Sequence, residues 1–139
     1  MTTHVRDVMS EGAECVGEDD SVLVAAHRLA ELQVGSVPIC GNDDRVKGML
    51  TDRDIVVKVL ARDLDPATVT AGSLAEGKPV TIGADDLLDY AMQTMAEHQV
   101  RRLPVIDGDK LVGMLSQADL VKALPEGRAG ELIQTISET

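Results

Sequence analysis

Apolar positions along the chain follow two different spacings, and the change from one to the other predicts helices and strands in a fixed order. Apolar residues recur at helical spacing over 22–32, behind the capping residue Ser21, and again over 87–95. Short apolar runs predict strands near 15–16, 37–40, 46–50, 80–82, 103–106 and 111–115. A second helix is expected after each strand pair, over 53–61 and 117–124.

This order of elements occurs twice, because the second half of the chain repeats the first. Residues 34–39 (VGSVPI) match residues 100–105 (VRRLPV) at an offset of 66. Residues 48–55 match 113–120 at an offset of 65, so one residue is missing from the polar turn between them. The sequence therefore predicts an α+β fold made of two β-α-β-β-α units, each with a parallel strand pair and a hairpin.

The repeat sets the expected domain boundaries. We expect the first unit over 5–62, a linker over 63–70, the second unit over 71–125 and a tail over 126–139 that can form a short amphipathic helix. One unit of this size buries too little surface to be stable alone, so the two units are expected to pack together.

Composition narrows the classes of function. The chain has 139 residues, a formal net charge of −11, one Tyr and no Trp or Phe. An acidic chain without aromatic stacking platforms is a poor match for nucleic acid or for an anionic membrane. No apolar run reaches the ~20 residues of a membrane span, and no signal peptide is visible at the N-terminus. The expected location is the cytoplasm, with leaderless export as an open alternative.

In each repeat, one motif spans the last strand and the start of the second helix. This motif resembles that of the CBS domain, which is named after cystathionine-β-synthase. Each copy reads Gly-h-h-[Ser/Thr]-x-x-Asp-h, where h is apolar, and follows an h-Pro-h strand; the copies are 48–55 after 37–39, and 113–120 after 103–105. The chain is also similar to the stand-alone, stress-response CBS proteins of actinobacteria. The resemblance implies two repeats packed as a pseudo-twofold pair, a regulatory role and frequent formation of homodimers.

The same motif supplies the candidate ligand-binding residues. A hydroxyl and a carboxylate three residues apart, between a strand and a helix, can contact a ribose and a phosphate. By resemblance, Asp54 and Asp119 are ribose-binding residues, and Thr51 and Ser116 are their hydroxyl partners. The alternative is a capping box, in which these side chains only satisfy the helix amides. The two roles are compatible.

Arginines near the motifs are candidates for phosphate contacts. Arg101 and Arg102 open the second h-Pro-h strand, and Arg53 lies inside the first motif. The alternative is that these side chains are solvated or paired with carboxylates of an acidic protein. The repeats differ here, since Gly35 and Ser36 occupy the positions of the two arginines in the first copy.

Two cysteines, Cys15 and Cys40, fall on the first two strands of the first repeat, which are expected to be neighbours. Adjacent strands can bring Cα atoms within the ~4.4–6.8 Å that a disulfide requires. The alternative is a pair of buried, reduced thiols. No metal site is expected, because the spacing of cysteines and histidines fits no zinc motif.

The leading interpretation is a sensor that binds an adenosine-containing ligand such as AMP, ATP, NAD or S-adenosylmethionine. The sequence favours none of these four, and the sensor would signal to an effector protein outside this chain. The alternative is a ligand-free structural or interaction protein of a stress response. An enzyme is not expected, because no catalytic set of residues is present.

Overall fold

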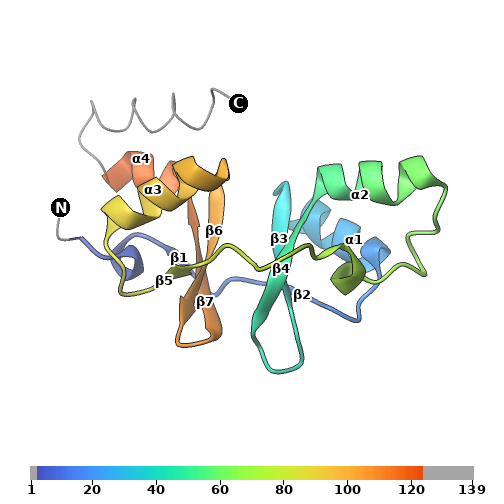
Figure 1. Ribbon diagram of the computed structural model, residues 1–139, viewed down its shortest axis with the longest axis horizontal. Coiled ribbons are helices and arrows are strands. Elements are labelled where there is room, and N and C mark those ends of the chain that lie inside the picture. The colour runs from blue at the N-terminus through green and yellow to red at the C-terminus, as the bar shows by residue number, and fades with distance from the viewer. Residues whose placement is uncertain (1–2, 124–139) are drawn as a thin grey trace. The chain divides into compact units, whose positions relative to one another are not determined.

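The computed structural model describes residues 3–123, which form two compact units (Figure 1). The middle unit spans Glu14–Pro79. The terminal unit joins the N-terminal residues up to Ala13 to the chain from Val80 onward. The tail that was expected over 126–139 lies outside the described residues.

The middle unit is a three-stranded sheet with two helices on one side of it (Figure 1). β2 runs parallel to β3, and β3 runs antiparallel to β4, in the order β2-β3-β4. The elements are β2 (Val16–Gly17), α1 (Val22–Leu32), β3 (Ser36–Cys40), β4 (Val46–Thr51) and α2 (Asp52–Lys58). A parallel pair joined through a helix and a following hairpin is the arrangement that the sequence predicts.

α1 begins behind the capping residue that the sequence predicts and ends at Leu32, shortly before Gly35, a residue type that often ends helices. The Ser21 hydroxyl accepts a hydrogen bond from the Val24 amide, which satisfies a free donor of the first turn. Gln33, and not Gly35, takes the left-handed conformation that ends the helix, with φ of 55°. Its amide donates to the carbonyls of Ala30 and Leu29, so hydrogen bonds offset the strain of a left-handed side chain.

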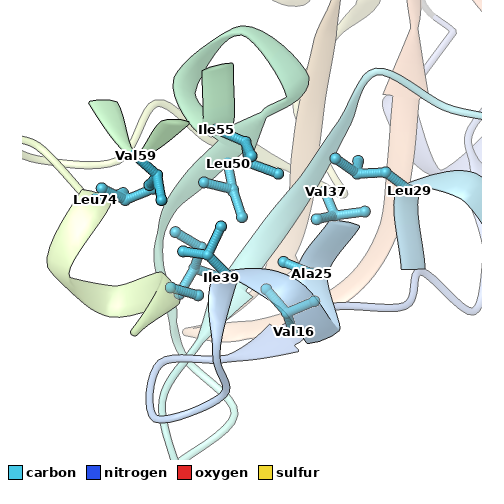
Figure 2. Close-up of a cluster of buried hydrophobic side chains, with 11 residues drawn as sticks. Val16, Ala25, Leu29, Val37, Ile39, Leu50, Ile55, Val59 and Leu74 are labelled. Atoms are coloured by element: carbon cyan, nitrogen blue, oxygen red, sulfur yellow. The ribbon is translucent and has the colours of Figure 1, made fainter. Parts of the chain in front are cut away.

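The core of the middle unit lies between the helices and the sheet (Figure 2). Both helices and all three strands contribute side chains, among them Val16, Ala25, Leu29, Val37, Ile39, Leu50 and Ile55. The packing is aliphatic because the chain has a single aromatic residue. Burial of one such side chain stabilises the fold by about 1.5–3 kcal/mol, so this cluster supplies most of what holds the unit.

The terminal unit repeats this architecture and adds one strand. Its sheet has the order β1-β7-β6-β5, and α3 and α4 lie on one side of it (Figure 1). The elements are β1 (Ser10–Glu11), β5 (Ile82–Gly83), α3 (Leu88–His98), β6 (Arg102–Asp107), β7 (Lys110–Ser116) and α4 (Gln117–Ala123). The two small mixed sheets with their helices confirm the α+β fold class.

The added strand belongs to an N-terminal segment that the repeat pattern does not account for. β1 pairs antiparallel with β7, with Ser10 opposite Met114. Val5 is fully buried in the core of the terminal unit. Arg6 forms ion pairs with Asp85 at 3.2 Å and with Asp107 at 3.0 Å, although water screens these exposed groups. The N-terminal segment therefore belongs to the terminal unit by its contacts, whereas the repeat along the chain assigns it to the first unit, 5–62.

No helix within residues 3–123 combines the length and the apolar composition that a bilayer crossing requires.

The motif glycine of each repeat allows another segment to pass close to the sheet. A Cβ atom on Gly113 would lie 2.6 Å from the Ser10 carbonyl oxygen, inside any normal contact distance. A Cβ atom on Gly48 would lie 2.9 Å from the Cβ atom of Ala75. Only glycine fits where another segment approaches so closely. This close approach explains why each motif begins with glycine.

We predict that Gly113→Ala destabilises the protein by about 1–3 kcal/mol, because β1 must move away from β7. Urea unfolding followed by circular dichroism measures the change. Gly35→Ala is the matched control, since its new Cβ atom would meet the nearest atom at 3.5 Å, an ordinary contact. An equal loss of stability in both variants would contradict the close-approach explanation.

Candidate functional site

The first candidate site lies where β4 meets α2 in the middle unit. Thr51 and Asp54 hold this junction by two reciprocal hydrogen bonds. The Asp54 amide donates to the Thr51 hydroxyl oxygen at 3.0 Å, and the Thr51 amide donates to Asp54 Oδ2 at 3.0 Å. This is the capping box that the sequence allows as one of two roles.

The same arrangement holds the junction of β7 and α4 in the terminal unit. The Ser116 amide donates to Asp119 Oδ2 at 2.9 Å, and the Asp119 amide donates to the Ser116 hydroxyl oxygen at 3.1 Å. Both side chains are half-buried. A hydroxyl oxygen that accepts one bond can still donate its proton, and a carboxylate has a second oxygen. Capping therefore leaves both groups chemically able to contact a ligand.

The two junctions differ in what lies beside the carboxylate. In the middle unit, Lys58 Nζ lies 3.2 Å from Asp54 Oδ1 and 3.1 Å from Glu76 Oε1. The Lys58 and Asp54 side chains are 23% and 22% exposed, so solvent screens this pair only in part. The hydrogen bond to Glu76 raises the pKa of Lys58 most, and the hydrogen bond to Asp54 raises it further. Both oxygens of Asp54 are thus engaged within the protein, one by an amide and one by an ammonium.

In the terminal unit, the position four residues after the carboxylate is Ala123 instead of a lysine. A hollow of about 240 Å³ borders Asp119 there, with Val8, Lys122 and Ala123 as its other lining residues. Val8 comes from the N-terminal segment, which places that segment at the candidate site as well as in the core. Lys122 is exposed and adds a positive charge to the rim.

The arginines divide between the two units. Arg102 begins β6 directly opposite Ser116 in the β6–β7 pairing. Burial lowers the pKa of Arg102, and the negative charge of Asp119 partly opposes this effect, so the structure brings Arg102 to the Ser116–Asp119 junction. Arg101 is exposed, and its carbonyl accepts from the Gln117 amide at 2.8 Å. Arg53 is exposed on α2 of the middle unit.

Sequence reasoning missed Lys58, Glu76, Val8 and Lys122. The difference between Lys58 and Ala123 was visible in the repeat alignment at an offset of 65. An Asp–Lys pair four residues apart on a helix is also a known ion-pair spacing. Val8 and Glu76 could not be found in this way, because they come from segments outside the matched motifs.

The two cysteines lie close together in the middle unit. Val16 pairs with Ile39, and Gly17 pairs with Cys40, so Cys15 and Cys40 are diagonal neighbours on one face of the parallel strand pair. Both are thiols; Cys40 is buried and Cys15 is half-buried. A hydrogen bond from the Cys40 thiol lowers the pKa of Cys15 to about 7. The same bond, with burial, raises the pKa of Cys40.

Within residues 3–123, the His, Cys, Asp and Glu side chains nowhere gather in threes that could hold a metal ion.

Relatives of known sequence cover nearly the whole chain. The sequence profile of the CBS domain matches residues 5–61 and 71–126. Hypoxic response protein 1 of Mycobacterium tuberculosis is 46% identical over 136 residues, which are 98% of this chain and 94% of that protein.

Solved structures agree with this match. The crystal structure of Hypoxic Response Protein I with two coordinated zinc ions has a TM-score of 0.83 and 48% identity, and the match covers 88% of this chain and 100% of that one. The structure of CBSX2 in complex with AMP has a TM-score of 0.74 and 25% identity, and the match covers 86% of this chain and 94% of that one. With both repeats matched in sequence and in fold, the chain belongs to the CBS domain family as a pair of CBS domains.

Proposed function

We propose that this CBS pair is a regulatory module that binds an adenosine-containing ligand and signals to a partner protein without catalysing a reaction. One observation carries the proposal: Asp119, which caps its helix together with Ser116 opposite Arg102 in the sheet, lines a hollow of about 240 Å³. The relative CBSX2, whose structure contains AMP, supports the choice of ligand class.

The chemistry of this junction suits a nucleotide. The Asp119 carboxylate can accept hydrogen bonds from ribose hydroxyls, as acidic residues do in dinucleotide-binding folds. The guanidinium of Arg102 can bind a phosphate through two donors. A ligand that binds only the folded state stabilises it, so binding is measurable as a shift in unfolding temperature.

We expect one of AMP, ATP, NAD or S-adenosylmethionine to raise the unfolding temperature in a saturable manner. A ligand that binds only the folded state stabilises it by about 2.7 kcal/mol at a hundredfold excess over Kd. The control is Asp54→Asn combined with Asp119→Asn, since asparagine keeps an oxygen that can cap the helix but loses the charge. A wild-type protein that shows no shift with any of the four at millimolar concentration would contradict the sensor role.

The second candidate function is a ligand-free structural or interaction protein of a stress response, and the contact between Cys15 and Cys40 favours it. We propose that these residues form a disulfide under oxidising conditions. The Cys15 thiolate attacks a sulfur of a small disulfide such as oxidised glutathione and releases one glutathione thiol. The Cys40 sulfur, after losing its proton, then displaces the second glutathione. Two thiols are oxidised while one glutathione disulfide is reduced to two thiols.

The rate of this oxidation should depend on pH in a defined direction. Because the pKa of Cys15 is lowered to about 7, its reactive thiolate forms as pH rises through 7 instead of at the higher pH of an ordinary thiol. Mass spectrometry of protein treated with oxidised glutathione follows the reaction. In Cys40→Ala the midpoint should move to higher pH, and only the mixed disulfide should form. Free thiols at both positions after prolonged treatment would rule the disulfide out.

We also propose that two copies of the chain associate through apolar side chains of the middle unit. Large apolar residues are exposed on α1, on α2 and just after α2, namely Leu23, Val24, Leu32, Val56, Val57, Leu60 and Leu64. Val56 and Leu60 are 55% and 52% exposed. Leu87 and Tyr90 are the other exposed large apolar residues of the described chain, so most of them belong to the middle unit, and such side chains mark interaction surfaces.

We predict that Val56→Glu converts a dimer into a monomer, because a carboxylate cannot be buried in an apolar interface without a partner. Light scattering coupled to size exclusion should give twice the chain mass of 14.8 kDa for the wild type and a single mass for the variant. A monomeric wild type, or a variant that stays dimeric, would show that this surface does not join two copies.

A further inference from the structure

The two CBS motifs are alike in sequence but unequal in what their carboxylates contact. Each aspartate caps its helix through one oxygen, at Asp54 in the middle unit and at Asp119 in the terminal unit. The difference lies on the other side of the carboxylate. There the chain places a lysine in one repeat and an alanine in the other, at matching positions 58 and 123.

The motif of the middle unit is closed by the protein itself. Lys58 bridges Asp54 and Glu76 with contacts of 3.2 and 3.1 Å. A ribose hydroxyl that approached Asp54 Oδ1 would compete with an ammonium, and a charged partner binds a carboxylate more strongly than a neutral hydroxyl does. The lysine side chain also occupies the space beside the carboxylate.

Within residues 3–123, the terminal unit has no lysine at the matching position beside its carboxylate. The Ala123 side chain ends at Cβ and carries no cation, and Ala123 and Asp119 both line the hollow of about 240 Å³. Its rim carries the Lys122 ammonium, and the half-buried Arg102 approaches Asp119 from β6. A hydroxylated ligand with an anionic group thus finds the Asp119 carboxylate for its hydroxyls and Lys122 for its charge.

We propose that only the Ser116–Asp119 junction of the terminal unit binds the nucleotide, and that Lys58 is an internal cation that closes the Thr51–Asp54 junction. This inference rests on the proposed function, since it assigns that function to one of two motifs. It also predicts a preference for AMP over adenosine, because Lys122 can contact the phosphate of AMP and a neutral nucleoside offers it no such group.

Isothermal titration calorimetry of the full chain with AMP tests the assignment. We expect one equivalent per chain for the wild type and an affinity about tenfold or more weaker in Asp119→Asn, the loss typical of a hydrogen bond to a charged group. Lys122→Met should weaken AMP but leave adenosine unchanged. Binding that is lost in Asp54→Asn and kept in Asp119→Asn would overturn the inference and leave the proposed function standing.

Exchanging the residues at positions 58 and 123 tests the closing cation directly. Ala123→Lys places an ammonium four residues after Asp119, as in the middle unit, and should weaken AMP about tenfold. Lys58→Ala frees Asp54 and should add a second, weaker equivalent. A stoichiometry of one in Lys58→Ala would remove Lys58 from its proposed role. If neither the wild type nor any variant binds AMP, the inference fails, and the unfolding test with ATP, NAD and S-adenosylmethionine decides the proposed function separately.

Discussion

Each of the two seven-residue helices that follow a hairpin depends on a reciprocal cap between a hydroxyl residue and an aspartate. A helix this short has more free amides than internal hydrogen bonds, so it needs side-chain partners at its first turn. Thr51 with Asp54 and Ser116 with Asp119 supply them. The cap also fixes each carboxylate beside the end of the sheet, so one set of contacts determines both the local fold and the position of the candidate binding group.

Because the cap uses one oxygen of each aspartate, the surroundings of the other oxygen decide what the junction can do. Beside Asp54, the Lys58 ammonium forms ion pairs with both Asp54 and Glu76, so the second oxygen of Asp54 already has a charged partner. Beside Asp119 the chain has Ala123, a hollow and the N-terminal residue Val8. The two repeats thus present junctions with the same cap but with different groups beside the carboxylate.

The sequence predicted the elements whose signals are local. The repeat, the strand order within each unit, the Ser21 cap and the motif caps all follow from residue spacing and side-chain chemistry. The contact of Cys15 with Cys40 follows from the prediction of adjacent strands. The placement of residues 3–13 could not be predicted, because β1 has only two paired residues and no alternating pattern. The left-handed conformation of Gln33 was also hidden, since glutamine rarely adopts it and the supporting bonds of its amide to Ala30 and Leu29 appear only in the structure.

The central claim is that two equally capped junctions differ in their capacity to bind, and residue-resolved NMR tests it most directly. A ¹⁵N-labelled chain is titrated with AMP while the amide signals of both motifs are followed. The account predicts saturable shifts at Ser116 and Asp119 and unchanged signals at Thr51 and Asp54. Shifts confined to Thr51 and Asp54, or equal shifts at both junctions, would contradict it.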